Sequence, residues 1–157
     1  MSKPNTHQVA RAGQHYVAAE LHRRGANARF EPNAPETHIL ASNTAKTRTV
    51  ALRIKTKRKG NWHAQIQDWA DLPPEVAETR FWIFVDLTDD PHRRPQFYIV
   101  PERWIQDDID RTHAQYLERH GGRRPQTQES KHHSIDEERI EQWADRWDLL
   151  GLFDRDR

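Results

Sequence analysis

The side chains best suited to bind a ligand lie in one basic stretch of the chain. Between positions 46 and 59 there are seven Lys or Arg residues and no acid. Alternation of residue type over residues 47–60 predicts a β-strand with one apolar face and a second face that carries Arg53 and Lys55. Adjacent cations without acidic neighbours produce a positive field that attracts a polyanion. The stretch therefore predicts a nucleic-acid-binding strand.

Residues beyond the strand extend this predicted interface. Lys57, Arg58 and Lys59 are expected to contact backbone phosphates, which gives binding that weakens with salt and depends little on base sequence. Trp62 is expected to stack on an unpaired base. Packing in the core stays open as the alternative for Trp62, because a tryptophan at the start of a strand more often packs than binds.

Composition limits the class of protein. A chain of 157 residues is expected to form one domain with a buried core. The absence of cysteine excludes disulfides and thiolate metal sites. No apolar run reaches the roughly 18 residues that a membrane helix needs, and the first residues lack the apolar segment of a signal peptide. We therefore expect a cytoplasmic protein that has no membrane partner.

The charged residues are distributed unevenly along the chain. Residues 1–63 contain 12 basic and three acidic residues, whereas the remainder contains 13 basic and 21 acidic residues. This asymmetry predicts a basic working half and an acidic supporting half. The alternative is that both charge blocks are simply solvated surface.

The basic strand must be positioned by elements on either side of it. Asn5 or Thr6 is expected to cap a first helix, which Gly25 ends. Period-2 patterns predict further strands at residues 26–31, 36–43, 61–67, 80–87 and 96–100. The first of these after the basic strand, 61–67, is expected to return on it as a hairpin. Two prolines, Pro73 and Pro74, predict a loop at residues 68–78. The strand at 80–87 is the most apolar and is expected to be buried on both faces.

Two helices are expected in the last third of the chain. Pro101 suits the first turn of a helix that runs to about Arg119, and residues 121–133 lack periodicity and predict a loop. Ser134 and Glu137 form a capping-box signature for a final helix. The apolar stripe of that helix is Ile140, Trp143, Trp147 and Leu150. The order of elements predicts an α/β or α+β fold around one central mixed sheet, with an N-terminal helix and two C-terminal helices.

This order and three motifs resemble the PD-(D/E)XK nuclease superfamily, particularly its restriction-endonuclease-like and Holliday-junction-resolvase-like members. The motifs are GQHYVAAELHRRG at 13–25, HIL at 38–40 and RIKT at 53–56. The resemblance covers roughly residues 8–100. It implies a single domain, 1–157, with a restriction-endonuclease-like core at about 6–100 and a helical extension at about 101–153.

The resemblance also implies where an active site would lie. In such nucleases two carboxylates and a backbone carbonyl hold Mg²⁺, the metal activates water, and a lysine positions or polarises the nucleophile. The corresponding motif positions in this chain are Gln14, His38, Arg53 and Lys55, and only Lys55 keeps the expected type. The guanidinium of Arg53 would repel a divalent cation. No metal site or cofactor is expected, and Mg²⁺ or Mn²⁺ would be needed only if cleavage is retained, with Glu36 as the substitute ligand.

The sequence thus favours a catalytically inactive nuclease-like protein that binds nucleic acid, with DNA as the first candidate. Arg53 and Lys55 would bind phosphate directly, and His38 would add a hydrogen-bond donor, chiefly below neutral pH. One alternative is a divergent metal-dependent endonuclease. Another is a protein-interaction subunit of a nuclease or defence complex, which an exposed stripe at Trp143 and Trp147 would support. Relatives of this shape also suggest a homodimer or a larger complex.

Overall fold

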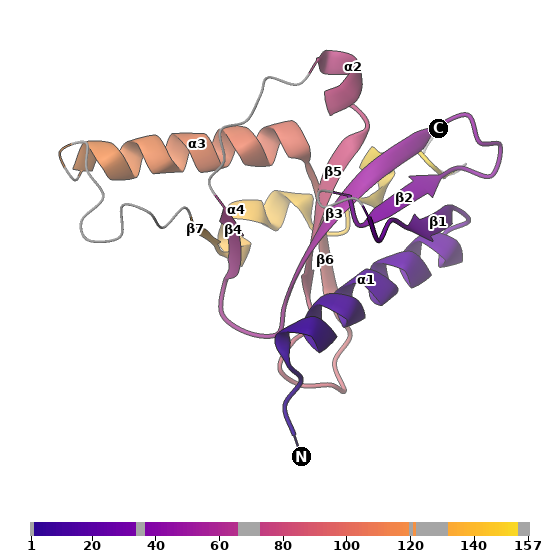
Figure 1. Ribbon diagram of the computed structural model, residues 1–157, viewed down its shortest axis with the longest axis horizontal. Helices are drawn as coiled ribbons and strands as arrows, with labels where there is room; N and C mark the ends of the chain where they lie inside the picture. Colours follow the sequence, from indigo (N-terminus) through magenta and orange to yellow (C-terminus); the bar gives the residue numbers. More distant parts are fainter. Residues whose placement is uncertain (1, 34–36, 66–72, 120, 122–131, 154–157) are drawn as a thin grey trace.

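A five-stranded mixed sheet forms the centre of the structure (Figure 1). Its strands are β1 (Asn27–Phe30), β2 (Ile39–Ser42), β3 (Thr49–Lys57), β5 (Arg80–Asp86) and β6 (Gln96–Pro101). They lie in the order β1-β2-β3-β5-β6, with β3 and β5 parallel and all other neighbours antiparallel. This computed structural model describes residues 2–33, 37–65, 73–119, 121 and 132–153. The predicted α+β class with a central mixed sheet is confirmed.

The first face of the sheet is covered by α1 (Thr6–Arg23). The helix begins at the predicted cap, where the side chains of Asn5 and Gln8 exchange hydrogen bonds with each other's backbone N–H groups, both at 2.9 Å. Gly13 lets the helix approach β3 closely, since a Cβ there would lie only 1.8 Å from Oγ1 of Thr56. The apolar face of β3 packs into the core of this layer, as its alternation predicted.

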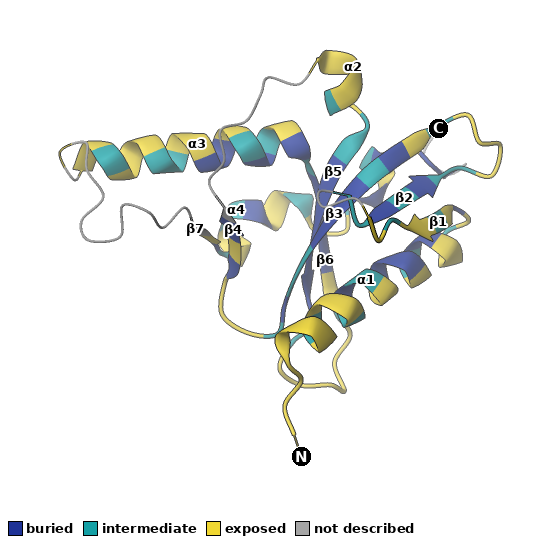
Figure 2. Ribbon diagram, in the orientation of Figure 1, coloured by how far each residue is buried: buried dark blue, intermediate teal, exposed yellow. Residues whose placement is uncertain are grey.

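The second face is covered by elements from the C-terminal half and by β4. They are β4 (Trp62–Gln65), α3 (Glu102–Arg119), β7 (His132–Ile135) and α4 (Glu137–Ile140). Figure 2 shows that β5 and β6 are largely buried, whereas β1 at the edge of the sheet and much of α1 and α3 are exposed. Residues 101–153, which were expected to be an extension, contribute side chains to the cores on both faces.

The hairpin predicted between the basic strand and residues 61–67 is wrong. β4 forms at Trp62–Gln65 but pairs antiparallel with β7, in a separate two-stranded sheet. On β3, β5 pairs with residues 51–57 along one edge, and β2 pairs with residues 49–52 along the other. The strand β7 includes His132 and His133, which were predicted to lie in a loop, while residues 122–131 of that loop lie outside the described residues.

The long final helix is also a wrong prediction. α4 has one turn, and its cap is Asp136, which accepts a hydrogen bond from the Arg139 N–H at 3.0 Å. Two 3₁₀ helices follow, η1 (Glu141–Trp143) and η2 (Trp147–Leu150). This break separates the expected aromatic stripe, because Trp147 packs in the core of the first face whereas Trp143 packs on the second.

A short helical turn lies between β4 and β5. Residues 73–78, predicted to lie in a loop, include a single helical turn, α2 (Pro74–Ala77). The remainder of that predicted loop, residues 68–72, lies outside the described residues. Within the described part of the chain, none of the helices has the length and apolar character needed to cross a membrane.

Candidate nucleic-acid interface

Two cations lie side by side over one indole on the second face of β3. The guanidinium carbon of Arg53 is 4.9 Å from the ring centroid of Trp82, and the ammonium of Lys55 is 5.8 Å from it. Both distances fall within the range of cation–π attraction. The parallel register of β3 and β5 creates this contact, since it places Arg53 opposite Trp82. Arg53 and Lys55 therefore share one side of β3 over Trp82, where Arg53 is buried, at 9% exposed, and Lys55 is half-buried.

His38 joins this pair through the backbone of β3. Its Nδ1 accepts a hydrogen bond from the Ile54 N–H at 2.8 Å, just beyond the point where β2 stops pairing with β3. Burial lowers the pKa of His38, and the nearby charges of Arg53 and Lys55 lower it further. The imidazole is thus held neutral, with Nδ1 as the acceptor and Nε2 carrying the proton.

Lys55 has no acidic partner among the described residues. Its ammonium is half-buried, and burial, followed by the charge of Arg53, lowers the pKa of Lys55. No carboxylate of residues 2–33, 37–65, 73–119, 121 or 132–153 lies within ion-pair distance of it. A partly desolvated cation of this kind gains from any anion that can approach it.

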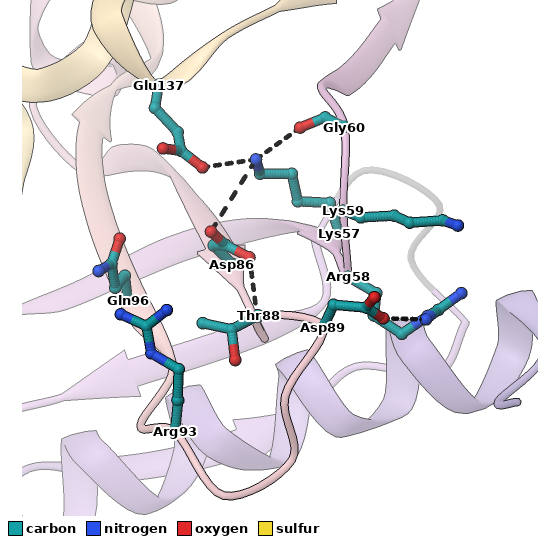
Figure 3. Close-up of a pocket in the computed structure, with 10 residues that line it drawn as sticks. All are labelled: Lys57, Arg58, Lys59, Gly60, Asp86, Thr88, Asp89, Arg93, Gln96 and Glu137. Carbon is teal, nitrogen blue, oxygen red and sulfur yellow. Dashed lines mark hydrogen bonds and ion pairs between the residues drawn. The ribbon is translucent and has the colours of Figure 1, made fainter. Parts of the chain in front are cut away.

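Lys57 lies on the same face but in a different environment. Its Nζ is 2.6 Å from Oε1 of Glu137, 2.6 Å from the Gly60 carbonyl oxygen and 3.9 Å from Oδ2 of Asp86. Figure 3 shows these three oxygen atoms around the ammonium. The predicted phosphate contact at Lys57 is therefore already taken by a carboxylate of the protein.

Arg58 and Lys59, which follow β3 in the chain, differ from each other in their ion pairing. Arg58 forms an ion pair with Asp89, whereas Lys59 is exposed. Figure 3 shows the Lys59 side chain directed away from the buried group at Lys57. Of the cations that follow the strand, Lys59 is thus the one best placed to meet a phosphate in solvent.

The stacking role predicted for Trp62 is not compatible with its position. The indole is 2% exposed, donates a hydrogen bond from Nε1 to the Val85 carbonyl at 3.0 Å and packs edge-on against Phe84 and Tyr98. The packing alternative describes this residue. A base could reach the ring only if the second layer opened.

The structure does not bring every motif position together. Gln14 lies on α1, next to Gly13. Gly13 packs against one face of β3, and Arg53 and Lys55 lie on the opposite face. Glu36, the predicted substitute ligand, lies outside the described residues. Within the described ranges there is no group of three or more His, Asp or Glu side chains arranged to hold a metal ion.

Sequence reasoning missed two residues that define the site. Trp82 supports both cations, and Glu137 neutralises Lys57, yet each lies far along the chain from β3. No local signal marks either contact, because both depend on strand register and on the packing of α4 over the sheet. The strand pattern of residues 80–87 predicted that Trp82 would be buried, without identifying what it would touch.

Comparison of the chain with protein-family models, with curated proteins and with solved structures finds no match. The geometry defines an α+β domain in which the imidazole of His38, just before β2, lies near Arg53 and Lys55 of β3.

Proposed function

We propose that this chain binds nucleic acid through the cationic face of β3, as a PD-(D/E)XK-like protein that does not cut its ligand. The observation that carries the proposal is Lys55, a half-buried ammonium without a carboxylate partner among the described residues. A phosphate would supply the missing anion. Arg53 lies beside it over the same indole and adds positive charge to the site.

The neutral state of His38 strengthens this site. Because Nδ1 accepts the Ile54 N–H, the proton on Nε2 is available to a phosphate oxygen without any need for acidic pH. This changes the sequence-based expectation that His38 would act as a donor chiefly below neutral pH. Protonation of Nδ1 would break its bond to the strand.

The charges favour binding over metal-dependent cleavage. A Mg²⁺ ion near Arg53 and Lys55 would approach two cations, and oxygen ligands are what that ion requires. The protein-interaction alternative depended on an exposed aromatic stripe, but Trp147 is 4% exposed and Trp143 packs edge-on against Trp104 at 5.4 Å. Neither alternative gains a specific observation from the described residues.

The test is fluorescence anisotropy of labelled single- and double-stranded DNA and RNA, measured in EDTA over a series of salt concentrations. Wild-type protein is expected to bind at least one of these polymers at low salt. Lys55→Gln is expected to weaken binding by about tenfold, the effect of one charge-assisted hydrogen bond. The slope of log affinity against log salt should fall by about one.

Lys46→Gln is the matched control. Lys46 lies in an exposed turn before the other end of β3, so this variant removes the same charge without touching the site. It is expected to change affinity by much less than Lys55→Gln. Equal effects of the two substitutions would show that only net charge matters, and absence of binding to every polymer at low salt would refute the proposal.

A further inference from the structure

A polar pocket opens where the carboxyl ends of β3 and β5 meet. It has a volume of about 480 Å³, which lies within the usual range for small-molecule sites. Its lining is Lys57, Arg58, Lys59, Gly60, Asp86, Thr88, Asp89, Arg93, Gln96 and Glu137. Every residue in this set except Gly60 has a polar side chain, so the pocket suits a ligand rich in hydrogen-bonding groups.

Buried polar side chains form the inner part of the pocket. Lys57 and Asp86 are each 9% exposed, and Oδ1 of Asp86 accepts the Thr88 N–H at 2.8 Å. Burial raises the pKa of Asp86, and the neighbouring Glu137 raises it further. The hydrogen bond from Lys57 lowers the pKa of Glu137. Negative charge is therefore concentrated on Glu137, where Lys57 offsets it.

Two of the lining cations are exposed, Arg93 and Lys59, and in Figure 3 the Lys59 side chain is directed away from the buried group at Lys57. Of the other lining cations, Lys57 pairs with Glu137 and Arg58 with Asp89. Arg93 is exposed, and none of the carboxylates among the described residues forms an ion pair with it. In Figure 3 its guanidinium and the Gln96 side chain lie on the same side of the pocket, opposite Arg58 and Asp89.

Gln96 offers a second donor. Its Oε1 accepts the Tyr98 hydroxyl at 3.3 Å, which orients the amide and leaves its NH₂ group free to donate. A guanidinium fork beside an amide NH₂ suits an anion with several acceptor oxygens. A phosphomonoester has three such oxygens and more negative charge than a phosphodiester within a strand.

We propose that this pocket binds a phosphomonoester, with Arg93 as the main contact and Gln96 as a second donor, and that its source is the terminal phosphate of a bound strand. The inference rests on the proposed function. Lys55 and Lys57 are two residues apart on one face of β3, about 7 Å along the strand. A nucleic-acid strand that binds Lys55 through an internal phosphate can therefore place its terminal phosphate in the pocket. The alternative source of the same chemistry is a free mononucleotide.

The test compares oligonucleotides of one sequence with a phosphate or a hydroxyl at the 5′ end, and likewise at the 3′ end, each labelled at the opposite end. One phosphorylated end is expected to bind about tenfold more tightly than its hydroxyl counterpart. Arg93→Gln should abolish this preference and leave the affinity of the hydroxyl form within about twofold. Arg94→Gln is the matched control, because Arg94 is an exposed neighbour that does not line the pocket, and it should keep the preference.

Competition with AMP and with inorganic phosphate distinguishes the possible sources. Equal affinity for phosphorylated and hydroxyl ends at both termini would overturn the terminal-phosphate inference while leaving internal binding at Lys55 intact. AMP binding that is lost in Arg93→Gln, without binding of any oligonucleotide, would overturn the proposed function and assign the pocket to a free mononucleotide. An end preference that survives in Arg93→Gln would contradict the assignment of Arg93.

Discussion

Lys55 and Lys57 occupy the same face of one strand, two residues apart, and have opposite environments. The ammonium of Lys55 lies over Trp82 without a carboxylate partner in the described part of the chain. The ammonium of Lys57 lies 4.4 Å from the ring centroid of Trp62 and contacts Glu137. Each ammonium lies near an indole ring, so the two sites differ in whether a carboxylate also contacts the ammonium.

This difference shows how the fold divides one basic run between two uses. The acidic half of the chain provides Glu137 and Asp89, which form ion pairs with Lys57 and Arg58. The charges of these two cations are therefore offset within the folded protein. Lys55 keeps a desolvated charge that the described residues do not neutralise. An unneutralised charge costs folding free energy, and such groups concentrate at functional sites.

The largest expected difference between the two lysines is in stability. Lys57→Met should lower the free energy of unfolding by about 2 kcal/mol, because Asp86 and Glu137 lose their cation in a partly buried site. The exposure of the Glu137 side chain, 46%, keeps the loss below that of a fully buried pair. Lys55→Met should change stability by less than about 0.5 kcal/mol. Urea unfolding measures both, and equal losses would remove the distinction.

The salt dependence of nucleic-acid binding should show the reverse pattern. Lys55→Gln should reduce the slope of log affinity against log salt by about one, since a phosphate contact is lost. Lys57→Gln should leave that slope unchanged, because its charge is already offset by Glu137. The comparison is made by anisotropy at temperatures where both variants are folded. A larger decrease of the slope in Lys57→Gln than in Lys55→Gln would mean that Lys57, and not Lys55, contacts the phosphate.

His38 should make stability depend on pH near neutrality. Its pKa in the folded protein is lowered from the ordinary value of 6.5, so the unfolded chain takes up a proton first as the pH falls. The free energy of unfolding should therefore decrease below about pH 6.5 and level off once folded His38 is also protonated.

His38→Asn is the variant that isolates this effect, because asparagine keeps a hydrogen-bond acceptor for the Ile54 N–H and does not titrate. Urea unfolding of both proteins between pH 5.5 and 7.5 gives the comparison. The same decrease in wild type and in His38→Asn would assign it to other groups. The pKa of Glu137 is lowered from its ordinary 4.5, so Glu137 contributes below this window. The pKa of Asp86 is raised from its ordinary 3.8, which favours the folded protein as the pH falls, the opposite sign to His38.

The smallest expected effect comes from making Lys57 resemble Lys55. Glu137→Gln removes the carboxylate charge from Lys57 and should strengthen binding of a phosphate in the pocket by about twofold, since partly exposed ion pairs are weak. Titration of wild type and Glu137→Gln with AMP measures the change. Weaker binding in the variant would mean that Glu137 itself contacts the ligand.

The sequence by itself determined those features that arise from local pattern. The start of α1 at the Asn5 cap follows from the residue type at that position. The apolar and cationic faces of β3 follow from period-2 alternation, because successive side chains in any strand point to opposite sides. These predictions required no knowledge of what packs against the strand.

The tertiary structure alone decided which cations are neutralised. Register between β3 and β5 placed Trp82 beside Arg53, and pairing of β4 with β7 buried Trp62. The packing of α4 brought Glu137 to Lys57 across 80 positions of the chain. Such contacts form between segments distant in sequence, and their energies depend on burial and on the neighbouring charge, which no local pattern contains.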